Sequence, residues 1–423
     1  MNYRKRISDK ILSEKLEAKG AVIIEGPKWC GKTCTAMQQA ESILRLDEPI
    51  NRDMNVQLAS VNPSKLLEGK VPRLIDEWQI APKLWDAARY EVDMRGDVGQ
   101  FIFTGSAVPV ESDDITHSGT GRFSWLTMRT MSLFESGDSS GEVSIEELFL
   151  SPDRISGVNQ LDMEQLAFLI CRGGWPATVN MRHRPALGQA FDYYDAVVKS
   201  DINRADGISK NSERVKKLMQ SYARHQGTQA SYKTIKKDIL ANDLDTMNED
   251  TVMLYINALK KIYVVEEMPA WNPNIRSKTA IRTSDTRYYV DPSIAVAALG
   301  VSPADLEKDM NTMGLLFETM CVRDLRVYAE SLGGEVKHYR DASGLECDAI
   351  IHLRNGQYGM LEIKLGGAEY IEEATKNLKK LSDKIDTDRM PKPAFKAVVI
   401  GIGQYAYRRE DGIYVIPIGC LKN

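Results

Sequence analysis

Short hydrophobic runs divide the first third of the chain. The segment AVIIEGPKWCGKTCTAMQQAESIL (21–44) begins with β-branched residues, passes through a loop with two glycines, and ends in a helical pattern. Further hydrophobic runs occupy 43–49, 71–77 and 100–104. Runs of this length predict buried strands. Strands that alternate with helices predict an α/β fold with a parallel sheet.

The middle of the chain has a helical pattern. The run MEQLAFLICRGG (163–174) ends on paired glycines, which is typical of a helix C-terminus. Three further helices are predicted within 212–227, 231–240 and 248–268, and the third runs into a predicted strand at 263–268. The third has Asn248 as its N-cap and one hydrophobic face formed by Val252, Tyr255, Ile256 and Leu259. A predicted hairpin follows at 272–290, and three helices followed by a hairpin form a winged helix.

The last third begins with an amphipathic helical pattern over 311–334. Three predicted strands follow, with the turn Arg-Asn-Gly between the second and the third. A second helical pattern and another strand then complete the order helix–strand–strand–strand–helix–strand. The three strands, the helix and the last strand lie at 335–340, 347–353, 357–365, 366–385 and 395–401.

Composition narrows the classes of protein that the chain can belong to. Its 423 residues predict two to four domains, and 43% hydrophobic with 27% charged residues is typical of a globular protein. The charged N-terminus and the lack of a long apolar run predict neither a signal peptide nor a membrane span. Six cysteines without paired zinc spacing favour a reducing cytoplasm. A net charge of −4 gives no global sign of nucleic-acid binding.

The loop after the first strand carries a phosphate-binding motif. The residues Gly26 to Thr33 read G-P-K-W-C-G-K-T and match G-x-x-x-x-G-K-[ST] in full. Backbone N–H groups of such a loop surround phosphates, Lys32 reaches the β and γ oxygens, and the Thr33 hydroxyl ligates Mg²⁺. The motif therefore predicts ATP and Mg²⁺ as cofactors. The predicted nucleotide-binding residues are Gly26, Pro27, Lys28, Trp29, Cys30, Gly31, Lys32, Thr33 and Cys34.

A second motif, Asp76-Glu77, ends the hydrophobic run at 71–77. We expect Asp76 to hold the Mg²⁺ shell with Thr33, and Glu77 to orient or deprotonate the attacking water. The candidate strand at 43–49 is expected to lie between the strands that carry these two motifs. That arrangement is typical of ATPases with a dedicated catalytic glutamate.

Two further residues have both a catalytic and a plain structural interpretation. Ser106 follows the strand at 100–104, where it would sense the γ-phosphate and the attacking water, or simply cap a turn. Arg122 precedes another hydrophobic run. It is either a surface residue or a finger offered to the nucleotide of a neighbouring subunit, which would require a homo-oligomer.

Together, these motifs resemble a family of prokaryotic AAA-type ATPases that carry a C-terminal domain of unknown function. The similarity rests on Gly26–Thr33, Leu74–Glu77, Thr104–Ser106, Gly121–Arg122 and MSLFE (131–135), with further similarity at RGGWPA (172–177) and WNPNIRSKTAIR (271–282). The resemblance extends over nearly the whole chain. It implies an ATPase core at 1–155, a helical lid at 156–205, a winged helix at 206–295 and a nuclease-like domain at 296–423. It implies no known physiological role.

Two carboxylates and an ammonium stand close together in the last third. Asp348 lies in one predicted strand, and Glu362 and Lys364 lie two residues apart on one face of the next. With the order of elements, they resemble the PD-(D/E)XK restriction-endonuclease-like fold, although LECD stands where PD is usual. The resemblance implies Mg²⁺ or Mn²⁺ between Asp348 and Glu362, with Glu318 as a third acid, Glu346 assisting and Lys364 as the catalytic lysine. The alternative is an ion network that cuts nothing.

Basic residues of the predicted winged helix are candidates for contact with DNA phosphates. They are Arg276, Lys278, Arg282 and Arg287 in the hairpin, and Lys233, Lys236, Lys237, Lys260 and Lys261 in the helices. Intramolecular docking is the alternative use. The whole pattern predicts a cytoplasmic ATPase that acts on nucleic acid through the nuclease-like domain. Its rival is a signalling or scaffold ATPase whose nuclease-like domain binds a protein.

Overall fold

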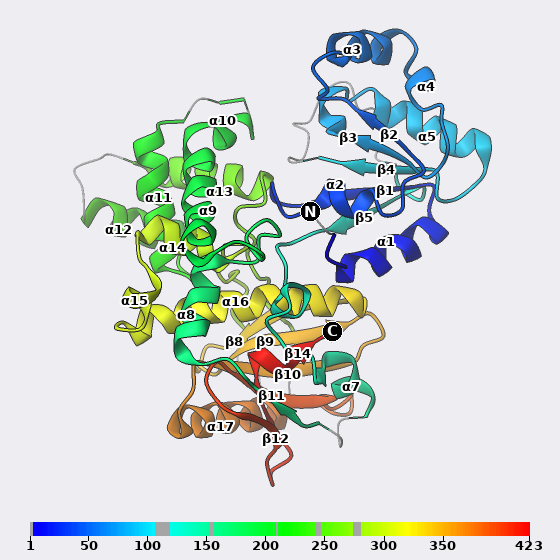
Figure 1. Ribbon diagram of the computed structural model, residues 1–423. Coiled ribbons are helices and arrows are strands. Elements are labelled where there is room, and N and C mark those ends of the chain that lie inside the picture. The colour runs from blue at the N-terminus through cyan, green and yellow to red at the C-terminus, as the bar shows by residue number, and fades with distance from the viewer. Residues whose placement is uncertain are drawn as a thin grey trace. The chain divides into compact units, whose positions relative to one another are not determined.

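The computed structural model describes residues 3–105, 119–151, 155–205, 207–208, 210–241, 247–273 and 281–423. Contacts group these residues into two compact units. The first unit comprises Met1–Thr130, Asp201–Ser209 and Ala258–Tyr263, and the second comprises Met131–Ser200, Lys210–Asn257 and Val264–Asn423. Each unit contains a sheet covered by helices, so the predicted α/β class is confirmed (Figure 1).

The first unit is built on a parallel sheet of five strands in the order β2-β3-β4-β1-β5. The strands are β1 Ala21–Glu25, β2 Ser42–Arg45, β3 Arg73–Asp76, β4 Phe101–Thr104 and β5 Phe123–Thr127. The helices are α1 Ile7–Ala18, α2 Lys32–Ala36, α3 Arg52–Val61, α4 Pro63–Leu66, α5 Leu84–Arg95 and α10 Ile202–Arg204, and a 3₁₀ turn spans Trp78–Ile80.

Side chains of β4 point alternately to the two faces of this sheet and contribute to the hydrophobic core on each face. Phe101 and Phe103 pack with Trp85 of α5 in one core, whereas Ile102 packs with Leu12 of α1 in the other. Successive side chains of a strand point to opposite faces, so an uninterrupted apolar strand is buried twice. This double burial explains why β4 has a central position.

The strand order corrects one expectation from the sequence. A strand does lie between the two motif-bearing strands β1 and β3, but it is β4, and not the segment predicted at 43–49. That segment forms β2, which pairs with β3 alone at the edge of the sheet. Its burial alternates between half-buried and exposed positions, so β2 lacks the apolar side chains that a central strand needs.

The helices of the second unit include those predicted from the pattern of the middle region. They are α6 Leu133–Ser136, α7 Ile145–Leu150, α8 Met163–Arg172, α9 His183–Ala196, α11 Ser212–Arg224, α12 Tyr232–Ala241, α13 Glu249–Lys261, α14 Pro292–Leu299 and α15 Pro303–Leu306. The α13 helix ends at Lys261, just before the predicted strand at 263–268, and its last residues belong to segment 258–263 of the first unit. Asn248 caps it, because its side chain accepts a 2.7 Å hydrogen bond from the Thr251 amide.

Antiparallel pairing follows these helices. The Met268 amide donates to the Thr286 carbonyl, the Thr286 amide donates to the Met268 carbonyl, and both distances are 2.9 Å. Segment 264–268 thus pairs with segment 286–290 in the manner of a hairpin. Residues 274–280, which include the predicted phosphate contacts Arg276 and Lys278, lie outside the described residues.

The second sheet has seven strands in the order β7-β12-β13-β11-β10-β9-β8. They are β7 Gly157–Val158, β8 Gly334–Arg340, β9 Glu346–Leu353, β10 Tyr358–Lys364, β11 Phe395–Ile400, β12 Tyr405–Arg408 and β13 Tyr414–Pro417. Figure 1 shows α16 Met310–Ser331 on one side of this sheet and α17 Ala368–Lys384 on the other. The predicted order helix–strand–strand–strand–helix–strand is confirmed.

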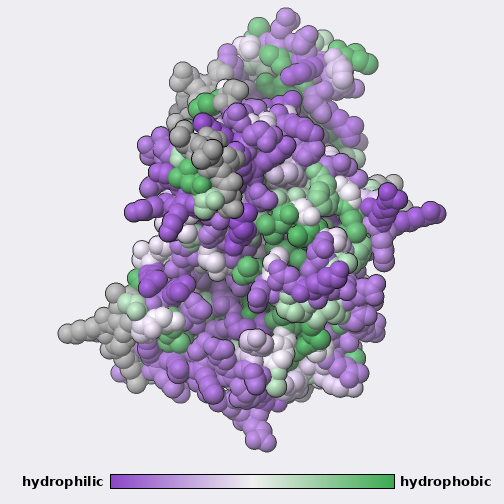
Figure 2. All heavy atoms as spheres, turned by 90° about the vertical axis from the view of Figure 1, so that its left-hand side faces the viewer, coloured by the Kyte–Doolittle hydropathy of each residue, from purple (hydrophilic) through white to green (hydrophobic). Residues whose placement is uncertain are grey.

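Residues from early in the chain pair with C-terminal strands, one pair as a separate two-stranded sheet and the other within the seven-stranded sheet. β6 Val143–Ser144 pairs with β14 Leu421–Lys422, and β7 pairs with β12. Residues 131–155, which the sequence groups with the ATPase core, therefore belong to the second unit. Hydrophilic side chains predominate on the face shown in Figure 2, with hydrophobic ones gathered in smaller patches. In the described part of the chain, no helix has the length and hydrophobicity that crossing a membrane requires.

Candidate functional site

The loop between β1 and α2 is shaped by two glycines in conformations that side chains avoid. Gly26 has φ of 144° and Gly31 has φ of 103°. A Cβ atom on Gly26 would lie 2.0 Å from the Met128 carbonyl oxygen, so only glycine fits there. Trp29 also adopts a positive φ of 66° although it has a side chain. The helix after the loop is shorter than the pattern predicts, since α2 ends at Ala36.

Lys32 lies inside this loop. Its side chain is buried, and its Nζ atom donates 2.8 Å hydrogen bonds to the carbonyl oxygens of Gly26 and Pro27. The loop therefore surrounds an ammonium group with its own backbone. The other predicted loop side chains differ in exposure, because Cys30 is buried and Cys34 is exposed.

Asp76 joins the loop to the C-terminal ends of the neighbouring strands. Its Oδ1 atom accepts hydrogen bonds from the Thr33 hydroxyl at 2.9 Å and from the Thr104 hydroxyl at 2.6 Å. Parallel strands present their C-terminal ends at one edge of a sheet, which explains why residues far apart in sequence meet there. The expected Thr33–Asp76 pair is thus brought together. Ser106 lies outside the described residues, and Thr104 contacts the pair instead.

Glu77 follows Asp76 in a strained backbone conformation, with φ of 55°. Its carboxylate accepts a hydrogen bond from the Gln79 amide. Burial raises the pKa of Glu77, and this outweighs the hydrogen bond from Gln79, which lowers it. A partly buried carboxylate with a raised pKa beside a phosphate loop has the properties of a general base.

Arg122 lies at the opposite end of the sheet. It immediately precedes β5, where Phe123 pairs with Ala21 at the start of β1, whereas the phosphate loop follows the end of β1. Its guanidinium donates to the exposed Asp93 carboxylate at 2.8 Å. The structure therefore does not bring Arg122 together with the phosphate loop of its own chain.

A second cluster of charges occupies strands β9 and β10 of the second unit. The Lys364 Nζ atom lies 3.0 Å from Asp348 Oδ2 and 2.9 Å from Glu362 Oε2. Asp348 Oδ2 also accepts a 2.8 Å hydrogen bond from the Ile363 amide. Glu362 is 1% exposed. The three residues predicted from the sequence therefore do meet.

Glu318 reaches the same neighbourhood from α16. Its Oε1 atom accepts a 2.5 Å hydrogen bond from the Tyr288 hydroxyl. Burial, helped by the charge of Asp348, raises the pKa of Glu318 to about 8. Glu318 and Asp348 line one small cavity, together with Glu346. Three of the acids that the sequence singles out thus line a common space, whereas Glu362 does not line it.

Burial and neighbouring charges shift the pKa values of Glu362 and Lys364 in this cluster. Burial raises the pKa of Glu362 well above its ordinary value, and the Asp348 carboxylate raises it further. Burial alone would lower the pKa of Lys364, but the charges of Asp348 and Glu362 outweigh it and raise that pKa. The cluster therefore favours the charged form of Lys364, whereas it disfavours the charged form of Glu362 relative to an ordinary glutamate.

Comparison with known proteins matches three segments of the chain. Residues 18–136 match a family model described as an AAA domain. These residues form an AAA-type P-loop ATPase domain. Residues 163–305 match a domain of unknown function (DUF8612), and residues 313–421 match another (DUF4143). The C-terminal charge cluster lies within this last segment.

Searches of curated proteins and of solved structures complete the comparison. No curated protein matches the chain. The Walker-type ATPase PABY2304 of Pyrococcus abyssi is 14% identical over 70% of this chain and 96% of its own, with a TM-score of 0.44. The Aeropyrum pernix ORC1 protein in complex with DNA is 13% identical over 71% of this chain and 93% of its own, with a TM-score of 0.26.

The AAA domain has the residues that a magnesium nucleotide requires. Gly26 leaves room where a Cβ would block the loop, and Lys32 lies inside that loop, as phosphate binding requires. The hydroxyl of Thr33 and the carboxylate of Asp76 are oxygen ligands of the kind that Mg²⁺ prefers. The C-terminal cluster offers a different observation. Glu362 Oε1 is buried and has no hydrogen-bond partner, which suits a further ligand. However, the described residues contain no group of three or more side chains placed to hold a metal.

Sequence reasoning missed several residues that brace the phosphate loop. Arg6 donates to the Cys30 carbonyl at 2.7 Å and to the Arg129 carbonyl at 2.9 Å. Lys28 pairs with Asp201 at 2.6 Å, a contact between residues 173 positions apart. No local pattern signals such contacts, because each joins the loop to a segment distant in sequence.

The basic residues expected to contact DNA differ in their exposure to solvent. Arg287 is buried and paired with Glu267, and its Nε atom donates to the Ala230 carbonyl at 3.0 Å, so it is not a surface phosphate contact. That expectation is corrected, because Glu267, which neutralises Arg287, lies outside the predicted hairpin at 272–290. Arg282 is exposed, as are Lys233 and Lys237 of α12.

Proposed function

We propose that this AAA-type ATPase acts on nucleic acid through a metal-dependent nuclease-like site formed by Asp348, Glu362 and Lys364. The cluster itself carries the proposal. Two carboxylates and a lysine on adjacent strands, beside a helix that contributes Glu318, have the chemistry of phosphodiester hydrolysis. A fold that needed only stability would gain little from burying these charges.

The AAA domain would hydrolyse ATP with four side chains. Bound Mg²⁺ would neutralise charge on the phosphates, and Thr33 and Asp76 are the residues that would hold it. Lys32 would exchange its loop carbonyl partners for phosphate oxygens. Glu77 would orient the attacking water and accept its proton, which suits its raised pKa.

In the C-terminal site, Asp348 and Glu362 would hold Mg²⁺ or Mn²⁺, and Glu362 Oε1 is the atom that lacks another partner. A cation held there would lower the pKa of a bound water and neutralise the scissile phosphate. Lys364 would stabilise the negative charge that develops during attack. Glu318 would contribute a third carboxylate from α16, and the ATP state would control the access of nucleic acid to this site.

A scaffold or signalling ATPase is the second candidate. Lys364 already neutralises both carboxylates at 3.0 and 2.9 Å, and within the described ranges no three-ligand group exists. Both observations suit an ion network that needs no metal. In that case the C-terminal domain would bind a protein and cut nothing.

Metal-dependent stability of the whole chain tests the proposal. A cation that binds only the folded protein raises the melting temperature, so Mn²⁺ should stabilise the wild type. Asp348→Asn should remove that response and leave ATP hydrolysis intact, since the AAA domain does not contain Asp348. A wild type whose melting temperature ignores Mn²⁺ and Mg²⁺ would favour the scaffold interpretation.

A further inference from the structure

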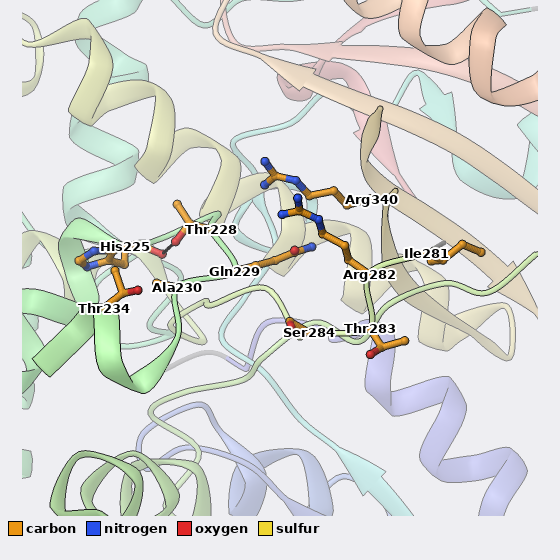
Figure 3. A pocket seen from close by; sticks show the side chains of 10 residues that line it. All are labelled: His225, Thr228, Gln229, Ala230, Thr234, Ile281, Arg282, Thr283, Ser284 and Arg340. Carbon is orange, nitrogen blue, oxygen red and sulfur yellow. Dashed lines mark hydrogen bonds between the residues drawn. The ribbon is translucent and has the colours of Figure 1, made fainter. Parts of the chain in front are cut away.

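A pocket of about 550 Å³ lies in the second unit. Its walls come from the turn between α11 and α12, from segment 281–284, and from Arg340 at the end of β8. Figure 3 shows the guanidinium groups of Arg282 and Arg340 next to one another, both directed toward Gln229 and Thr228. Among the described residues that line this pocket, none is acidic. We call it the Arg282–Arg340 pocket.

The backbone holds the two arginines together. The Arg282 amide donates to the Arg340 carbonyl at 2.8 Å, and the adjacent residues Ile281 and Asp341 form an antiparallel bridge. Two positive charges on neighbouring segments repel one another, and an anion bound between them would relieve that repulsion. The backbone pairing therefore maintains an arrangement that the side chains alone would disfavour.

The guanidinium of Arg340 has donor capacity to spare. Its Nε atom is buried and has no hydrogen-bond partner. Its ion pair with Glu346 is long, at 3.5 Å, and both of these side chains are partly exposed. An arginine fork with an unused buried donor suits an anion with several oxygens, and a phosphate matches its geometry.

A neutral histidine behind the pocket links two of its lining residues. The Gln229 amide donates to His338 Nδ1 at 3.1 Å, and His338 Nε2 donates to the Ser284 carbonyl at 3.0 Å. Burial lowers the pKa of His338, which keeps the ring neutral and supports this pattern of donors. Gln229 and Ser284, which come from two different lining segments, are thus linked through one ring. The pocket is preorganised and does not need to assemble around its ligand.

The pocket adjoins the carboxylate cluster. Gln229 and Arg340 also line the smaller cavity that contains Glu318 and Asp348. Arg340 pairs with Glu346 in the β8–β9 register. Asp348 lies two residues beyond Glu346 on the same face, roughly 6.6 Å farther along the strand. An anion bound by the arginines would therefore lie beside the proposed cleavage site.

We propose that the Arg282–Arg340 pocket binds a backbone phosphate of a nucleic-acid strand whose neighbouring phosphate is at Asp348. This inference rests on the proposed function and adds the residues that position the strand. The two arginines would recognise the charge of the strand and not its sequence, because they would contact phosphate oxygens and no base. A free phosphate or nucleotide has the same anionic chemistry, so the test must separate these sources.

The test measures binding of labelled single-stranded and duplex oligonucleotides to the full chain in EDTA, over a range of salt concentrations. Each lost phosphate contact should lower the log–log salt slope by roughly 0.7 to 0.9. Arg282→Gln should therefore lower the slope by about one contact, and the double variant with Arg340→Gln by about two. Arg282→Lys should keep most of the slope. Arg354→Gln, an exposed arginine of the β9–β10 turn, is the matched control and should change nothing.

The outcomes separate this inference from the proposed function. If wild type binds and the arginine variants bind equally well, the pocket assignment is overturned, while metal-dependent cleavage could still stand. If the variants lose binding but wild type cuts nothing in Mn²⁺, the pocket stands and the nuclease fails. If inorganic phosphate raises the melting temperature of wild type but not of Arg282→Gln, and oligonucleotides do not bind, the nucleic-acid ligand is overturned. An unchanged melting temperature of each variant in the absence of ligand verifies folding.

Discussion

Replacing Lys364 by methionine should reveal whether its two carboxylates form a cation site. The change keeps most of the side-chain volume but removes the ammonium that lies 3.0 Å from Asp348 and 2.9 Å from Glu362. Glu362, at 1% exposure, would then lack its only ionic partner among the contacts described. Removing one partner of a buried ion pair costs about 3–5 kcal/mol.

The lower end of that range applies here. Lys364 is 27% exposed, and Asp348 keeps its hydrogen bond from the Ile363 amide. A loss of about 3 kcal/mol corresponds to a decrease in melting temperature of roughly 6–12 °C for a domain of this size. The loss should shrink at pH 5, because Glu362, whose pKa is already raised, would take up a proton and no longer carry a charge.

A divalent cation should restore the stability of Lys364→Met. Mn²⁺ at a hundred times its dissociation constant would contribute about 2.7 kcal/mol, which nearly offsets the loss. Lys384→Met is the matched control, since Lys384 pairs with the buried Asp341 at 2.6 Å and is 26% exposed. Its melting temperature should also fall, but Mn²⁺ should not restore it. Calorimetry at pH 8 measures the melting temperatures of both variants with and without Mn²⁺. Equal responses of the two variants to Mn²⁺ would refute the cation site.

Three further predictions concern the phosphate loop, Glu77 and the buried glutamates of the second unit. Lys32→Ala should abolish ATP binding in a fluorescent-nucleotide titration, because it removes the direct phosphate contact; retained binding would contradict the loop assignment. Glu77→Gln should bind ATP but release phosphate at least roughly tenfold more slowly, and wild-type turnover would exclude Glu77 as the base. Without metal, stability should fall as pH rises from 4.5 toward 8, because the folded protein retains protons on Glu318 and Glu362 that the unfolded chain has lost. Glu318→Gln should flatten this decline in a series of melting curves, and an unchanged decline would contradict the raised pKa.

Local sequence predicted the elements that carry the chemistry. The glycines of the phosphate loop, the Asp76-Glu77 strand end, and the order of elements around β9 and β10 all depend on short-range patterns, and each is present in the structure. The meeting of Asp348 with Glu362 was also predictable, because a hairpin with a short turn fixes the register of its two strands.

Long-range pairing was not predictable from these patterns. The position of β4 between β1 and β3 depends on which strand has two buried faces, and the burial of Arg287 depends on Glu267, which precedes the hairpin. The Arg282–Arg340 pocket joins a loop to the end of β8, 58 residues later in the chain. Periodicity within a single element contains no information about such contacts.

Cleavage of a supercoiled plasmid by the full chain tests the central claim most directly. The assay compares wild type with Asp348→Asn, in Mg²⁺ or Mn²⁺, with and without ATP. The account predicts nicking by wild type that requires the divalent cation, responds to ATP, and disappears in Asp348→Asn while that variant still hydrolyses ATP. Wild-type protein that hydrolyses ATP but leaves the plasmid intact under every one of these conditions, or nicking that survives in Asp348→Asn, would contradict it.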